Sequence, residues 1–196
     1  MRPGTKRLIR ITVWICTMFV ALTGTPGTGK TTVGDLLSDQ GFRVIHLTDI
    51  ETKCVVGEDK KRECLIYDID LMNKYLPKDP LLIQSDVCIV EGHLSHLLSG
   101  ATKIIILRCH PEELKKRLKK KGYPSLKIHE NLEAEALDII LCDAACCHIT
   151  GTIREIDTTH KDPVEVTRFI AVLLQDGFQG EIGRIDWSDW IEKNVG

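Results

Sequence analysis

The chain has 196 residues, of which 43% are hydrophobic and 28% are charged, as is typical of one soluble globular domain with a substantial core. Its formal net charge of −2 excludes the strongly basic character of a protein that binds nucleic acid over its whole surface. Eight cysteines lie mostly within apolar stretches, and no pair has C-x-x-C spacing, which favours small buried thiols over a disulfide framework or a zinc site.

The N-terminal stretch resembles a secretory signal, because residues 8–22 are largely apolar and follow several basic residues. Arg10 interrupts this run, which is also too short to span a bilayer, so we expect no membrane partner. Its end, residues 18–22, is predicted to form a buried strand that leads into a glycine-rich stretch. We therefore expect Met18 to be the natural initiator and residues 1–17 to be an upstream extension; a genuine extra strand or arm is the alternative.

A phosphate-binding motif follows this strand, and it reads Gly24-Thr25-Pro26-Gly27-Thr28-Gly29-Lys30-Thr31-Thr32. It fits the pattern G-x-x-x-x-G-K-[ST] and precedes a stretch with helical spacing. Backbone N–H groups on such a strand-to-helix turn converge on a polyphosphate at the positive end of the helix dipole. We expect ATP phosphates to bind Gly27, Gly29, Lys30, Thr31 and Thr32, with the Thr31 hydroxyl on Mg²⁺.

The rest of the chain alternates between strand and helix signals. Further strands are expected at residues 42–47, 87–90, 103–107 and 153–157. Helices are expected from Thr48 by capping-box spacing, before Pro77, from Pro111, over 125–147 and from Pro163, whereas residues 51–64 are expected to be a charged, solvated segment over the cleft. This order predicts an α/β fold with a five-stranded parallel sheet, helices on both faces, and a ligand at the carboxyl ends of the strands.

Two charged residues are predicted at those carboxyl ends. Glu91 follows the third strand, as a Walker-B acid does, and Arg108 follows the fourth. A GTPase is disfavoured because Asn73-Lys74-Tyr75-Leu76 lacks the aspartate of N-K-x-D, and no D-x-x-G follows the third strand. A motor or AAA-type ATPase would normally need a longer chain, so a small P-loop kinase remains.

Four motifs together resemble the adenylate kinase isoenzyme 6 family: the phosphate-binding motif, Ile89-Val90-Glu91-Gly92-His93, Leu107-Arg108 and Arg117-x5-Tyr123. The resemblance covers about residues 18–175 and leaves 176–196 as a C-terminal tail. It implies a nucleoside-monophosphate (NMP) kinase fold with an NMP-binding segment at about 47–70 and a short lid at about 108–118. It also implies an ATPase in small-ribosomal-subunit maturation, with a transient ribosomal-protein partner of the uS11 type on a pre-ribosomal particle.

The resemblance suggests roles for individual residues. Lys30, Glu91, His93 and Arg108 are the expected catalytic set; Glu91 would hold Mg²⁺ through water, and Arg108 would contact phosphate. Family members commonly carry aspartate where this chain has Glu91. The side chain of glutamate is one methylene longer, so its contact with Mg²⁺ through water is expected to differ. His93 is tied in the family to ATP hydrolysis and ribosome maturation.

The expected function is phosphoryl transfer from ATP to an NMP, AMP first, together with ATP hydrolysis in rRNA maturation in the cytoplasm. Two alternatives stay open. One is an assembly ATPase with little kinase activity, and the other is a small-metabolite P-loop kinase. We expect the tryptophans of the tail, Trp187 and Trp190, to cover the chain's own domain rather than to dock a partner.

Overall fold

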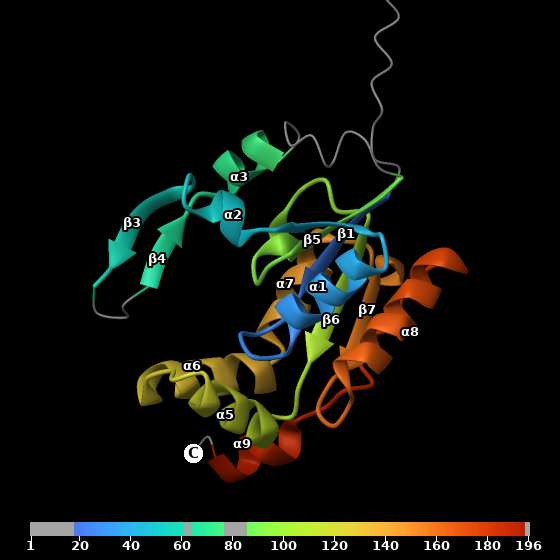
Figure 1. Ribbon diagram of the computed structural model, residues 1–196. Helices are drawn as coiled ribbons and strands as arrows, with labels where there is room; N and C mark the ends of the chain where they lie inside the picture. The colour runs from blue at the N-terminus through green and yellow to red at the C-terminus, as the bar shows by residue number, and fades with distance from the viewer. Residues whose placement is uncertain (1–17, 61–63, 77–85, 195–196) are drawn as a thin grey trace, which may run out of the picture.

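A computed structural model describes residues 18–60, 64–76 and 86–194, so the prediction for residues 1–17 lies outside the described residues. Five strands form one sheet in the order β2-β5-β1-β6-β7, and every neighbouring pair is parallel (Figure 1). They are β1 (Met18–Thr23), β2 (Arg43–His46), β5 (Val87–Glu91), β6 (Lys103–Arg108) and β7 (Ile153–Asp157). The predicted parallel sheet is confirmed.

Helices cover both faces of this sheet, as predicted (Figure 1). One face packs against α1 (Lys30–Asp39) and α8 (Pro163–Gln175) through Val20 and Leu22 of β1. The other face packs against α2 (Thr48–Glu51), α3 (Ile69–Tyr75) and α7 (Ile139–Cys147). Successive side chains of β1 point to opposite faces, and the whole strand is apolar up to Thr23 because both faces are covered.

A third group of helices lies beyond the carboxyl ends of the strands. It consists of α5 (Pro111–Lys120), α6 (Ser125–Ala136) and α9 (Ser188–Asn194), which share one apolar cluster. Trp190 is buried in that cluster, and its indole N–H donates a hydrogen bond to Glu112 at 2.8 Å. The C-terminal tail therefore covers its own domain, as expected. Single 3₁₀ turns, η2 (Ser95–Leu97) and η3 (Thr150–Thr152), complete the described elements.

The segment after β2 differs from its prediction as a loose solvated stretch. It forms an antiparallel hairpin, β3 (Val55–Asp59) and β4 (Cys64–Tyr67), which projects from the body of the molecule (Figure 1). The helix predicted at Thr48 is present but short, and its N-cap is Leu47 with no side-chain cap, so the capping box is wrong. The short helix before Pro77 is confirmed as α3, capped by Asp68, which accepts from the Leu71 N–H at 2.9 Å.

The helix predicted over 125–147 is in fact two helices. α6 ends at Ala136 and α7 begins at Ile139, and Asp138 between them has a left-handed backbone with φ of 56°. A non-glycine residue in that conformation is uncommon and is held by its surroundings. Here the surroundings are ionic, because the Asp138 carboxylate accepts a hydrogen bond from Arg108.

Candidate functional site

The predicted phosphate loop joins β1 to α1 in the conformation that the motif requires. Gly29 is the N-cap of α1 with φ of 101°, a left-handed value that favours glycine. The Lys30 ammonium donates to the Thr25 carbonyl at 3.2 Å, so the lysine folds back over the loop. Burial lowers the pKa of Lys30 to about 8 while the Glu91 carboxylate opposes the shift, so the ammonium stays mainly charged at pH 7. The loop thus presents N–H groups and one cation to an anion.

Glu91 lies beside this loop and is 4% exposed. One carboxylate oxygen accepts from the Thr31 hydroxyl at 3.3 Å, and the other is 2.9 Å from the His46 Nδ1. His46, at the end of β2, also lies 3.3 Å from Asp35 of α1. A hydroxyl next to a carboxylate provides the oxygen ligands that Mg²⁺ prefers. Within the described residues there is no group of three or more His, Cys, Asp or Glu that could hold a metal ion.

His93 follows Glu91 by two residues and lies close enough to Lys30 to feel its charge. Gly92 between them packs against α2 so closely that a Cβ there would be 2.6 Å from the Cβ of Leu47. The His93 side chain is 43% exposed, and its Nδ1 is 3.9 Å from the carboxylate of Glu51. Desolvation in the cleft lowers the pKa of His93 to about 4, helped by the charge of Lys30, so the imidazole is neutral at pH 7. A neutral imidazole can accept a proton or a hydrogen bond.

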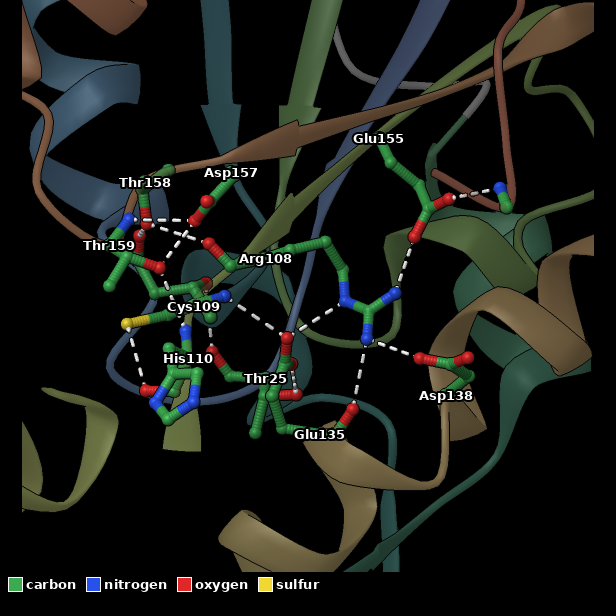
Figure 2. A network of polar contacts seen from close by, with 12 residues as sticks. Thr25, Arg108, Cys109, His110, Glu135, Asp138, Glu155, Asp157, Thr158 and Thr159 are labelled. Carbon is green, nitrogen blue, oxygen red and sulfur yellow. Dashed lines mark hydrogen bonds and ion pairs between the residues drawn. The ribbon is translucent and has the colours of Figure 1, made fainter. Parts of the chain in front are cut away.

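Arg108 contradicts its predicted role. Its guanidinium is 2% exposed and binds three carboxylates, those of Glu135, Asp138 and Glu155 (Figure 2). Burial lowers the pKa of this group, but the carboxylates, Glu135 first, outweigh burial and raise it. With its N–H groups directed at protein oxygens, Arg108 is an internal anchor rather than a donor to phosphate. The prediction failed because a strand-end arginine can point either way, and its carboxylate partners lie 27 to 47 residues away.

The Arg108 cluster reaches the phosphate loop through Glu135 (Figure 2). One Glu135 oxygen accepts from Arg108 Nε at 2.8 Å, and the other accepts from the Thr25 hydroxyl of the loop at 2.5 Å. Glu155 of β7 extends the cluster by accepting from the Gly183 N–H at 2.7 Å. The loop, α6 and β7 are therefore tied together by buried polar contacts, and a part-buried contact adds the C-terminal tail.

A cavity of about 510 Å³ opens beside the phosphate loop, within the usual range for small-ligand sites. Its walls come from the loop, α1, the end of α5 and the turn before α8; they include Gly27, Thr28, Gly29, Thr32, Arg117, Lys120, Lys121, Thr158, Lys161 and Val166. Four cations and an apolar wall suit an anionic ligand with a flat apolar part. The Arg117 guanidinium donates to the carbonyls of Thr158 and Thr159 at 2.8 Å each, so it shapes the cavity.

The predicted lid, residues 108–118, comprises the end of β6, a short loop and most of α5. Leu114 and Leu118 are fully buried in the cluster with α6 and α9. Closure of this segment by itself would break those contacts.

Sequence reasoning missed His46, Glu51 and Glu135. His46 carried a usable signal, since it is a polar residue at the carboxyl end of a predicted strand. Glu51 was interpreted as part of a helix cap, which hid its direction toward the cleft. Glu135 was given no role, although it stands one residue before the buried Ala136.

Comparison with known proteins gives relatives over most of the chain. A family profile described as an AAA domain matches residues 20–138. A protein of Methanothermobacter thermautotrophicus is 38% identical over 175 residues, 88% of this chain and 98% of its own length. A protein of Pyrococcus furiosus is 38% identical over 179 residues, which are 91% of this chain and 96% of its own length. Both carry the name "Putative adenylate kinase". Because the AAA-domain profile matches residues 20–138 of this short chain, chain length was a wrong reason to set the AAA class aside.

Solved structures similar to this one include a shikimate kinase from Acinetobacter baumannii in complex with shikimate, with a TM-score of 0.56 and 17% identity over 82% of this chain and 95% of that one. A gluconokinase from Sinorhizobium meliloti has a TM-score of 0.53 and 14% identity, over 82% of this chain and 94% of that one. At these identities the likeness shows the fold, that of the P-loop kinases. Among the described residues, none of the helices has the length and apolar character needed to cross a bilayer.

Proposed function

Because the chain belongs to the family of these archaeal proteins, we propose that it is an NMP kinase that converts ATP and AMP into two ADP, using Mg²⁺. The observation that carries this proposal is the phosphate loop with its buried Lys30, which opens onto a cation-lined cavity of about 510 Å³. Phosphoryl transfer requires mainly positioning and neutralisation of charge, and these residues supply both.

The residues present fit Mg²⁺, which would neutralise phosphate charge when bound. Thr31 and Glu91 would hold the ion, Glu91 through water, and the His46 contact would fix the Glu91 carboxylate. This contact supports a function for glutamate in place of aspartate, since the longer side chain reaches both Thr31 and His46. Lys30 would bind the transferred phosphoryl group, and Gly27, Gly29 and Thr32 would line the path of the phosphates.

An ADP-formation assay across AMP, GMP, CMP and UMP, with and without Mg²⁺, tests the kinase proposal. A slow background of ADP from ATP hydrolysis is expected without an NMP. ADP formation above that background should require both Mg²⁺ and an NMP, and it should be fastest with AMP. ATP turnover that no NMP changes would contradict the kinase assignment. A panel of small hydroxylated metabolites in the same assay covers the alternative of a metabolite kinase.

A second activity, ATP hydrolysis in small-subunit maturation, is supported by the neutral, half-exposed His93 beside Lys30. On this proposal the chain binds a uS11-type protein on a pre-ribosomal particle and leaves after hydrolysis. His93→Ala should still bind ATP but should fail to mature small-subunit rRNA in a cell that depends on the protein. Pull-down of neither a uS11-type protein nor small-subunit rRNA would contradict this role.

A further inference from the structure

Glu51, the last residue of α2, carries a buried carboxylate oxygen without a hydrogen-bond partner. The residue is 6% exposed, and its Oε1 has no partner among the residues that the structure describes. Leaving such an acceptor unsatisfied is unfavourable, so each case calls for an explanation. No expectation from the sequence gave this side chain a role in the cleft.

His93 supplies the donor that is within reach. Its Nδ1 lies 3.9 Å from the Glu51 Oε1, about 1 Å beyond a normal hydrogen bond. Tyr67, the last residue of β4, completes the group, because its hydroxyl interacts with the Glu51 carboxylate. The Tyr67 ring also meets the imidazole edge-on, with ring centres 6.4 Å apart. The imidazole is therefore bordered by an acid and an aromatic ring from the segment between β2 and β5.

The backbone holds these groups in register. The Leu47 N–H donates to the Glu91 carbonyl at 2.7 Å, which ties the start of α2 to the end of β5. Gly92 lets Leu47 approach that strand end, since a Cβ on Gly92 would overlap it. Glu51 lies one helical turn after Leu47, and its N–H donates to the Leu47 carbonyl at 2.8 Å. A movement of about 1 Å in the His93 side chain would close the contact without disturbing this frame.

We propose that Glu51 is a positioning residue for His93. When ligand fills the cleft, the Nδ1–H of His93 donates to the Glu51 Oε1, and Nε2 is left as the acceptor that faces the reacting phosphate. An acid that orients an imidazole fixes its tautomer and direction in this way in other catalytic sites. Because Glu51 and Tyr67 belong to the segment between β2 and β5, a ligand or partner on that segment would act on His93 through them. This inference rests on the proposed role of His93 in ATP turnover.

The test compares Glu51→Met, which removes both acceptors at similar length, with Glu51→Gln, which keeps one. Glu51→Met should lower kcat for ATP hydrolysis about 10- to 100-fold with KM for ATP within twofold of wild type. Glu51→Gln should recover part of that loss. The double variant with His93→Ala should be no slower than His93→Ala alone, because the acid acts through the imidazole. Glu192→Gln, at an exposed acid on α9 away from the cleft segments, is the matched control and should leave turnover unchanged.

An independent reading comes from the ¹⁵N chemical shifts of His93 in the complex with Mg²⁺ and a non-hydrolysable ATP analogue. Wild type should show a protonated Nδ1 and an unprotonated Nε2, and Glu51→Met should lose this preference. Unchanged shifts and turnover in Glu51→Met, or additive losses with His93→Ala, would overturn the inference. If wild type itself shows neither AMP phosphorylation nor ATP hydrolysis, the proposed function fails, while the shifts still decide whether Glu51 orients His93.

Discussion

The side of the cleft that carries the phosphate loop, here called the donor side, and the opposite side, formed by α2, α3 and the β3–β4 hairpin, are built differently. On the donor side, the phosphate loop is held by contacts from distant parts of the chain: Thr25 donates to Glu135 of α6, and the Thr158 hydroxyl donates to the Thr28 carbonyl at 2.9 Å. The same Thr158 hydroxyl lies 2.9 Å from the carbonyl of Arg108. Each of these contacts is buried, so the loop is set before any ligand arrives.

The side toward β3 and β4 consists of short, local pieces. It has the four-residue α2, the two-stranded β3–β4 hairpin and α3. Val56, Leu65 and Ile66 of the hairpin are 61%, 49% and 49% exposed. α2 and α3 contribute to a buried apolar cluster, whereas the hairpin exposes much of its apolar surface, and local structure with few buried contacts opens at low cost. The contrast suggests that the phosphate-loop side of the site is preorganised for phosphate, while the side with the β3–β4 hairpin can change conformation when a ligand or partner binds.

The largest effect on stability is expected at Arg108, where several buried contacts hold the donor side together. Arg108→Met should lower the free energy of unfolding by about 3–5 kcal/mol, since it leaves the buried Glu135 and Glu155 without their counter-charge. Urea unfolding followed by circular dichroism measures this loss. Arg184→Met is the control, because Arg184 is 81% exposed and its ion pair with Glu181 should contribute under about 1 kcal/mol. Equal effects of the two substitutions would mean that the Arg108 cluster does not anchor the loop.

The next effect concerns chemistry and leaves folding intact. Lys30→Ala should reduce phosphoryl transfer at least about 100-fold, because the cation that neutralises the transferred group is gone. The unfolding midpoint should be close to wild type or slightly higher, since burial of the ammonium is itself unfavourable. Steady-state ADP formation and urea unfolding on the same preparation check both halves. Lys116→Ala, at a 74% exposed position on α5, should change neither.

The phosphate loop and the Arg108 cluster differ in how far the sequence could predict them. The strands and the phosphate loop were predictable because their signals are local: apolar runs of strand length and a motif that carries its own turn. The role of Arg108 and the break at Asp138 were not, because they depend on contacts between residues far apart in the sequence; Arg108 and Asp138 lie 30 positions apart. The hairpin was missed for another reason. Its apolar pairs, Val55-Val56 and Leu65-Ile66, do not alternate with polar residues, and the charges between them suggested solvated chain.

Two buried cysteines allow the stability of the two sides to be compared directly. Cys54, after α2, and Cys109, after β6, are both fully buried, and burial raises the pKa of each thiol, that of Cys109 to about 12. Alkylation requires the thiolate, so each reacts only when its surroundings open. Cys54 should react about 10-fold faster than Cys109 under native conditions, and AMP with an ATP analogue should slow Cys54 the more.

Mass spectrometry of partially alkylated protein gives both rates from one sample. The exposed Cys142, Cys146 and Cys147 on α7 serve as internal standards for unhindered reaction, and their exposure corrects the expectation that the cysteines are mostly buried. Equal rates at Cys54 and Cys109 would mean that the two sides open together, as one cooperative unit.

The smallest effect is expected on the hairpin surface. Val56→Thr and Leu65→Thr should each change the free energy of unfolding by less than about 0.5 kcal/mol, because they remove apolar groups that are already in water. Leu22→Ala in β1, a fully buried position, should cost about 2–5 kcal/mol in the same assay. If the hairpin substitutions instead weaken retention of a uS11-type protein, their apolar side chains serve binding rather than folding. A loss of more than about 1.5 kcal/mol in stability would show that the hairpin packs against the body, and the contrast between the two sides would then disappear.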